Sequence, residues 1–120
     1  MKYLVVLSIN PDVLDALTED EQQAIGAGHQ KFLATTKESG EFHSTVALAE
    51  PAKSTVVKVR NGVPAVTDGP FVESKEFLGG YYLIDVASAE RAQELAAMIP
   101  DAAIEGLGVE IRPVVFEDGL

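Results

Sequence analysis

The sequence predicts an α+β domain of the ferredoxin-like βαββαβ type with an extra β-hairpin arm. Three observations predict it. Two segments have the periodicity of amphipathic helices, short apolar runs typical of strands flank each of them, and an Asn-Gly pair between the two halves is typical of a tight hairpin turn. A length of 120 residues suits one domain, so residues 1–120 are assigned to a single domain.

Residues 2–9 are the first predicted strand, because they form a short, continuous run of mostly apolar and branched side chains. Asn10-Pro11-Asp12 breaks this strand. The first helix is predicted to begin at the capping box Thr18-Glu-Asp-Glu21 and to run to about Ser39, where Gly40 provides a C-terminal stop.

His29 falls on the apolar stripe of this helix, four residues after Ile25 and four before Leu33. A histidine there can accept or donate a proton near neutral pH, and a carboxylate bonded to one ring nitrogen makes the other more basic. The alternative is a structural histidine bonded to a backbone carbonyl. The other histidine, His43, is predicted to lie at the surface of a strand.

The middle of the chain is predicted to form strands and a hairpin. Alternating side chains predict a half-buried strand over residues 42–48, which Pro51 ends. Residues 55–60 and 63–66 are predicted to pair as the two strands of the arm, because Asn61-Gly62 between them is a strong type I′ turn signal.

The tetrapeptide Asp68-Gly69-Pro70-Phe71 predicts a stiff loop after the hairpin. Gly69 allows a tight turn, Pro70 fixes its own φ, and Phe71 can anchor the end of the loop in a core. Such a loop holds the carboxylate of Asp68 in one place, which makes Asp68 a candidate site residue. The alternative is a rigid turn that only precedes a strand.

The second half of the chain is predicted to repeat the order strand, helix, strand. Residues 80–86 and 109–116 are the strands, and Ser88 caps a helix that runs to about Ile99, where Pro100 ends it. The predicted buried face of this helix consists of Ala92, Leu95, Ala96 and Ile99.

Both faces of the predicted sheet carry apolar side chains. In the first strand Tyr3 and Val5 point to one face and Leu4 and Val6 to the other. Two helices can cover only one face, and an antiparallel sheet with one solvated face should alternate apolar and polar residues. We therefore expect a homodimer in which the two sheets pack face to face as a barrel-like sandwich.

The composition excludes several classes of protein. A net charge of −10 argues against nucleic acid and against anionic membrane surfaces as partners. The first apolar run is too short to span a membrane, so a cytoplasmic location is the default expectation. Without cysteine there is no thiolate catalysis, and two histidines without His-x-x-x-His or Glu-x-x-His spacing give no tetrahedral metal site. No metal is therefore expected, and a magnesium site made of carboxylates is the open alternative. No cofactor is expected, because Gly26-x-Gly28 lies within a helix and is therefore no phosphate loop.

Three segments resemble the DGPF-type branch of the YCII-related proteins: the run from Thr67 to Glu76, the following Gly79-Gly80-Tyr81-Tyr82, and the closing Val109-Glu-Ile-Arg-Pro-Val114. The resemblance covers nearly the whole chain. It implies a ferredoxin-like fold and a dimeric α+β barrel, in agreement with the expectation from the two-sided strands.

The resemblance also implies site residues. The wider YCII-related group is thought to use a His–Asp pair, and a member of that group is a lyase that acts on a ring compound. The histidine of that pattern is followed by Leu four and Gly eleven residues later, a spacing that His29, Leu33 and Gly40 reproduce. The aspartate lies in an Asp-Pro-Tyr segment after the second helix, where this chain has the reversed order Pro100-Asp101. Asp68 is therefore expected to be the partner of His29, with Asp101 as the alternative.

Three further residues are predicted to bind substrate. Lys75 and Arg112 would bind an anionic group, and Tyr82 would offer its hydroxyl to a pocket. Each has a structural alternative: Lys75 pairs with a neighbour in a charged loop, and Tyr82 packs in the core or an interface. Arg112 pairs with one of three carboxylates, Glu110, Asp85 or Glu76.

Together these residues and the resemblance predict a cofactor-free lyase or isomerase that uses a His–Asp pair on a small cyclic or carboxylated molecule. The alternative is a non-catalytic dimeric module that binds a small-molecule ligand or a regulatory protein, since many DGPF-type members resemble companions of alternative sigma factors. A third interpretation is a scaffold whose DGPF loop only stabilises the dimer.

Overall fold

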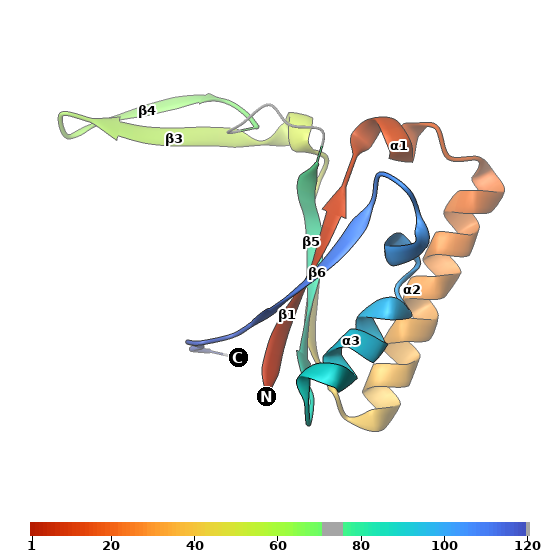
Figure 1. Ribbon diagram of the computed structural model, residues 1–120. Coiled ribbons are helices and arrows are strands. Elements are labelled where there is room, and N and C mark those ends of the chain that lie inside the picture. Colours follow the sequence, from red (N-terminus) through yellow and green to blue (C-terminus); the bar gives the residue numbers. More distant parts are fainter. Residues whose placement is uncertain (71–75, 120) are drawn as a thin grey trace.

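A four-stranded antiparallel sheet forms the centre of the fold in the computed structural model, which describes residues 1–70 and 76–119. Its strands are β1 (Lys2–Ile9), β2 (Phe42–Ala47), β5 (Phe77–Asp85) and β6 (Gly108–Pro113), and they lie in the order β2-β5-β1-β6 (Figure 1). The architecture is therefore α+β, and its connectivity is consistent with the predicted ferredoxin-like type.

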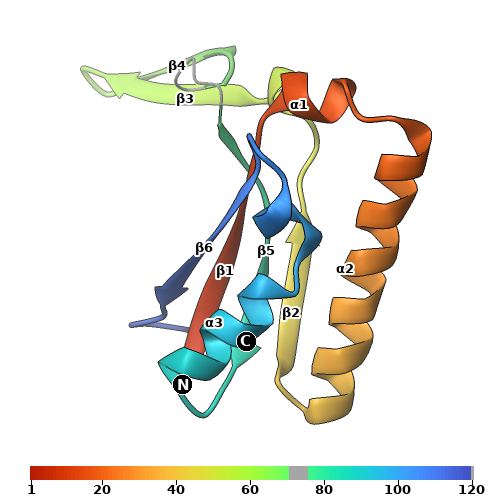
Figure 2. The ribbon, with the colours of Figure 1, turned by 45° about the vertical axis from the view of Figure 1, so that its right-hand side comes forward.

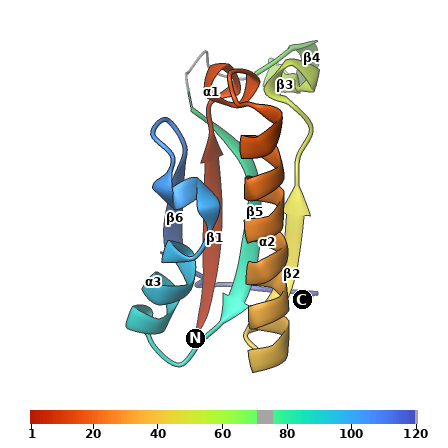
Figure 3. The ribbon, with the colours of Figure 1, turned by 90° about the vertical axis from the view of Figure 1, so that its right-hand side faces the viewer.

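The long helices cover one face of this sheet. α2 (Glu19–Ser39) and α3 (Ala89–Ala97) lie on the same side in all three ribbon views (Figures 1, 2 and 3). A short helix, α1 (Pro11–Asp15), and two 3-10 turns, η1 (Pro51–Lys53) and η2 (Pro100–Ala103), complete the helical elements of the described residues. None of the helices described here combines the length and the apolar character needed to cross a bilayer.

The sequence signals at both ends of α2 are confirmed. The Thr18 hydroxyl accepts a hydrogen bond from the Glu21 amide, and the Glu21 carboxylate accepts one from the Thr18 amide, so the predicted capping box is complete. At the other end Gly40 adopts a left-handed conformation with φ of 79°, which a glycine reaches without the steric cost of a Cβ.

The hydrophobic core lies between the helices and the sheet. It is built from alternate residues of β1 and β5 and from the inward faces of α2 and α3. The apolar side chains of the helices therefore pack against those of the strands. Its buried members are Tyr3, Val5, Phe32, Tyr82, Ile84, Val86, Ala92, Leu95 and Ile99.

No helix among the described residues covers the other face of the sheet (Figure 1). The strand registers place Leu4 opposite Leu83 and Val6 opposite Tyr81, so apolar side chains from β1 and β5 lie side by side on this face. This two-sided pattern is the one that the sequence predicted. We call the surface formed by Leu4, Val6, Val46 and Tyr81 the bare face; Leu83 lies on the same side of the sheet but is only 3% exposed.

A two-stranded arm projects from the sheet on the side of the bare face (Figures 1 and 2). It consists of β3 (Thr55–Arg60) and β4 (Val63–Asp68), joined by a turn in which Asn61 and Gly62 have φ of 52° and 76°. Two positive φ values are typical of the predicted type I′ turn. The arm leaves four valines largely exposed, namely Val57, Val59, Val63 and Val66.

The structure corrects the predictions at four places. β5 begins at Phe77, three residues earlier than expected. Asn10-Pro11 does end β1, but it also starts α1, because the Asn10 side chain caps the helix and Pro11 is its first residue. Asp68 is not in a loop beyond the hairpin: it is the last residue of β4 and pairs with Thr55. The last strand ends at Pro113, three residues earlier than expected.

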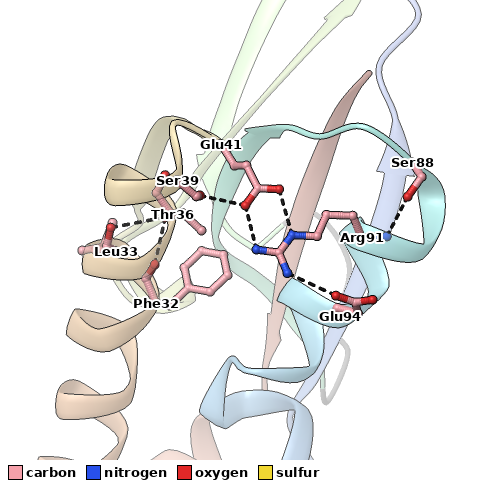
Figure 4. A network of polar contacts seen from close by, with 8 residues as sticks. All are labelled: Phe32, Leu33, Thr36, Ser39, Glu41, Ser88, Arg91 and Glu94. Atoms are coloured by element: carbon pink, nitrogen blue, oxygen red, sulfur yellow. Dashed lines mark hydrogen bonds and ion pairs between the residues drawn. The ribbon is translucent and has the colours of Figure 1, made fainter.

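An ion-pair network joins the C-terminal end of α2 to α3 (Figure 4). The Arg91 guanidinium donates two hydrogen bonds of 2.9 Å to Glu41 and one of 3.1 Å to Glu94. Ser39 donates a further bond of 2.7 Å to Glu41. The two bonds from Arg91 to Glu41 form a bidentate contact that fixes α3 against the turn between α2 and β2. The guanidinium also holds the pKa of the Glu41 carboxyl below its ordinary value.

Candidate functional site

His29 makes two short side-chain contacts with residues that are distant in the sequence. Its Nδ1 atom lies 2.6 Å from the hydroxyl oxygen of Tyr82, and its Nε2 atom lies 2.7 Å from Oδ1 of Asp101. The imidazole also stacks beside the Tyr82 ring, with the ring centroids 5.8 Å apart. Three elements therefore meet at this point: α2 supplies His29, β5 supplies Tyr82 and η2 supplies Asp101.

A close approach between α2 and η2 makes the contact with Asp101 possible. Gly28 precedes His29 and Pro100 precedes Asp101, and a Cβ placed on Gly28 would lie only 2.1 Å from Cγ of Pro100. Any side chain at position 28 would therefore push the two elements apart. The fully buried Ile99 anchors the chain just before this contact.

Asp101 is an unusual residue for its position, because aspartate is rarely buried unless it is paired. It is 5% exposed, and its carboxylate contacts the imidazole of His29. The same surroundings act on Tyr82: burial, followed by the negative charge of Asp101, raises the pKa of Tyr82 from 10.0 to about 12. At neutral pH Tyr82 is therefore a phenol with a proton to donate.

A cavity of about 340 Å³ lies against His29 and Tyr82. Its described lining is otherwise mostly apolar and contains no lysine or arginine; the other members are Leu7, Leu33, Thr45, Val46, Ala47, Gly79 and Gly80. The two glycines are sterically required, because a Cβ would lie 2.5 Å from the Ile9 side chain at Gly79 and 2.4 Å from the Val46 carbonyl oxygen at Gly80. The Gly79-Gly80 pair thus lets the strands close around the cavity.

Within one chain the structure does not bring Asp68 to His29. Both ring nitrogens of His29 contact other groups, and Asp68 is an exposed residue of the arm. The alternative partner, Asp101, is the one that the structure brings to His29. The sequence did contain a signal for Asp101, since an aspartate follows the second helix in this chain as it does in the family pattern. Because the order of aspartate and proline is reversed here, Asp68 was expected to be the partner instead.

The other predicted site residues lie apart from the cavity. Arg112 is in β6, 72% of its side chain is exposed, and its guanidinium donates a hydrogen bond of 2.7 Å to Glu110, which is the structural alternative predicted for it. Register with Leu4 places Arg112 on the side of the bare face. Lys75 lies outside the described residues. Tyr82 does line the cavity. Among the residues that the structure describes, no cluster of three or more His, Asp or Glu side chains could hold a metal ion.

The chain of Asp101, His29 and Tyr82 is suited to moving a proton. A carboxylate beside an imidazole stabilises the charged ring, and the phenol joins the ring to the cavity through a hydrogen bond. The burial of Asp101 and Tyr82 strengthens such electrostatic contacts, because the dielectric constant is lower inside a protein than in water.

Comparison with known proteins identifies the family. An uncharacterized protein of Rhizobium meliloti (strain 1021), R00369, is 28% identical over 116 residues, which cover 97% of this chain and 94% of that protein. The family model of the YCII-related domain matches residues 1–116. This range includes every strand of the sheet and the three hydrogen-bonded residues Asp101, His29 and Tyr82. The protein therefore belongs to the YCII-related family.

Proposed function

We propose that this protein catalyses acid–base chemistry on a small, mostly apolar molecule bound in the cavity beside His29. The single observation that carries the proposal is the buried carboxylate of Asp101, bonded at 2.7 Å to a histidine that lines a cavity. A buried Asp–His pair at a concave, apolar surface is the arrangement in which side chains act as general acid and base.

The cavity supports a lyase or isomerase acting on an uncharged ring better than one acting on a carboxylated molecule. The described lining offers His29, Tyr82 and Thr45 as polar groups and no cationic side chain other than a protonated His29. A carboxylate there would meet mainly apolar surface and pay a desolvation penalty without an arginine or lysine to compensate. A weakly acidic C–H or O–H group facing Tyr82 and His29 has no such cost.

Deuterium exchange tests the proposal without a known substrate. Uncharged cyclic ketones are incubated with the protein in D2O, and loss of the proton next to the carbonyl is followed by NMR. We expect exchange that falls about 10²- to 10⁴-fold in His29→Gln, the usual contribution of a general base. His43→Gln is the matched control, because His43 lies in β2 outside the cavity lining, and it should keep the exchange rate. Exchange that is equal in the two variants, or absent in the wild type for every ketone, favours the non-catalytic binding module instead.

We also propose that the working form is a homodimer joined through the bare face. The apolar side chains of this face lack a covering helix, while the arm and the segment after β6 project beyond it on the same side (Figure 1). That segment exposes Val115 and Phe116 by 98% and 81%, as expected if they contact a second copy. A stable dimer needs about 1,200 Å² of buried surface, which a sheet face with two projecting segments can supply.

Sedimentation of Val6→Glu against Ala34→Glu tests the homodimer. Val6 lies on the bare face, whereas Ala34 is exposed on α2, so both variants add the same charge at opposite sides of the molecule. We expect the wild type and Ala34→Glu to sediment as dimers at micromolar concentration and Val6→Glu as a folded monomer. A monomeric wild type at that concentration would refute the proposal.

A further inference from the structure

Both ring nitrogens of His29 lie within hydrogen-bonding distance of another side chain. Nε2 is 2.7 Å from the Asp101 carboxylate, and Nδ1 is 2.6 Å from the Tyr82 hydroxyl. Because a carboxylate accepts hydrogen bonds, the network assigns a proton to Nε2. In the neutral ring Nδ1 is then an acceptor, and the Tyr82 hydroxyl donates to it.

We propose that Tyr82, not His29, exchanges a proton with the bound molecule, and that His29 stores this proton behind it. The inference rests on the proposed function and deepens it, because it names the group that touches the reacting atom. Tyr82 lines the cavity, and its hydroxyl bonds His29, so this residue contacts both the cavity and the Asp–His pair.

The transfer balances without a co-reactant. The C–H or O–H bond of the bound molecule breaks, its electron pair stays on that molecule, and its proton forms a bond to the Tyr82 oxygen. The original hydroxyl proton of Tyr82 moves to Nδ1 of His29, which becomes an imidazolium between Tyr82 and the Asp101 carboxylate. The reverse sequence returns a proton to another atom of the molecule, as an isomerase or lyase requires.

The burial of Tyr82 explains why it needs His29. Its side chain packs in the core against Phe32, with ring centroids 4.5 Å apart, and its pKa is raised to about 12. Tyrosinate is therefore scarce at neutral pH, and the oxygen becomes basic only as its proton passes to the imidazole. The buried Asp101 opposes a free negative charge on Tyr82 and favours the positive charge on His29.

The test follows the ring signals of the protein as it exists, labelled with ¹³C at Cζ of tyrosine and ¹⁵N in histidine. When His29 becomes protonated, Nδ1 turns from acceptor to donor, and Tyr82 changes from donor to acceptor. We expect the Tyr82 Cζ signal to move at the midpoint of the His29 titration, while Tyr3 and Tyr81 stay unchanged as internal controls. His29→Gln assigns the histidine signals, because His43 is then the one histidine left in the chain.

A chromogenic probe tests the transfer itself. 4-Nitrophenol absorbs visible light only when ionised, so its spectrum at a fixed pH reports whether the bound phenol has lost its proton. We expect the ionised fraction of the bound probe to fall about ten-fold or more in both Tyr82→Phe and His29→Gln. Tyr82→Phe keeps the aromatic ring beside Phe32, which preserves the packing of the core.

The outcomes separate this inference from the proposed function. A Tyr82 signal that stays flat through the His29 titration overturns the inference, whether or not the probe binds. Equal ionisation in the wild type and Tyr82→Phe, with loss in His29→Gln, also overturns it but leaves the Asp101–His29 pair as the working base. Equal ionisation in all three proteins contradicts both.

Discussion

Replacing Gly28 by alanine should disconnect His29 from Asp101 without touching either residue. The added Cβ would lie 2.1 Å from Cγ of Pro100, whereas ordinary contact begins at about 3.4 Å, so α2 and η2 have to separate by about 1.3 Å. A separation of that size along the contact between Nε2 of His29 and Oδ1 of Asp101 would lengthen their distance from 2.7 Å to about 4 Å, which is beyond hydrogen-bonding range.

Gly26→Ala is the matched control, because a Cβ at Gly26 meets no atom within 4 Å in the same helix. Alanine gains up to about 1 kcal/mol of helix propensity over glycine at either position, but overpacking against Pro100 costs about 1–3 kcal/mol at position 28 alone. The two variants should therefore differ by about 1–3 kcal/mol in the free energy of urea unfolding, with Gly28→Ala the less stable.

The site readout comes from a double-mutant cycle with Asp101→Asn, using the ¹⁵N NMR signal of Nε2 in the His29 ring at a fixed pH. In the wild type and in Gly26→Ala, replacing the carboxylate should move this signal, because the 2.7 Å contact between Nε2 and Oδ1 of Asp101 is changed. In Gly28→Ala the same replacement should change the signal little. If Gly28→Ala matches Gly26→Ala in stability and in this cycle, the close approach of α2 and η2 does not position the pair.

Three further predictions concern the fold. Thr18→Ala removes the side-chain acceptor of the α2 capping box and should lower the free energy of unfolding by about 1 kcal/mol in urea. Because Arg91 lowers the folded-state pKa of Glu41, this ion pair should stabilise the protein at pH values above the unfolded-state pKa of Glu41, and this stabilisation should be lost as pH falls through the folded-state pKa. In Glu41→Gln the fall of the melting temperature at acid pH should therefore be less steep than in the wild type. Because the folded-state pKa of Tyr82 is raised from 10.0 to about 12, the stabilisation that comes from its protonated hydroxyl should be complete below pH 10 and lost as pH rises through about 12. If the melting temperatures of Tyr82→Phe and the wild type depend on alkaline pH in the same way, this prediction is wrong.

Local signals in the sequence were sufficient for most of the fold. The capping box at Thr18, the left-handed stop at Gly40 and the Asn61-Gly62 turn each act over a few residues, and each is where it was predicted. Such features depend on backbone sterics and on one or two hydrogen bonds, so tertiary packing does not need to be known. The apolar character of both sheet faces was equally readable, because strand alternation is a local property.

The partner of His29 could not be predicted in the same way. Asp68 lies two residues before Pro70 and Asp101 directly follows Pro100, and the sequence contains no local feature that shows which of the two reaches His29. The choice is made by the distance between α2 and η2, which depends on the missing side chain at Gly28 and on the burial of Ile99. α1 was missed for a related reason: Asn10-Pro11 is compatible with both a strand end and a helix start, and here it is both.

The site depends on the packing of the two halves of the chain against each other. Tyr82 lies 53 positions from His29, and Asp101 lies 72 positions from it, so neither half contains the whole hydrogen-bonded chain. Each member is also part of the core or next to it: Phe32 follows His29 by three residues and packs on Tyr82, and Ile99 precedes Asp101 by two. Substitutions that remove volume would therefore disturb fold and chemistry together. Replacements that keep the shape, such as His29→Gln and Tyr82→Phe, remove a hydrogen bond or a proton and leave the core filled, so a loss of proton transfer in them can be assigned to chemistry.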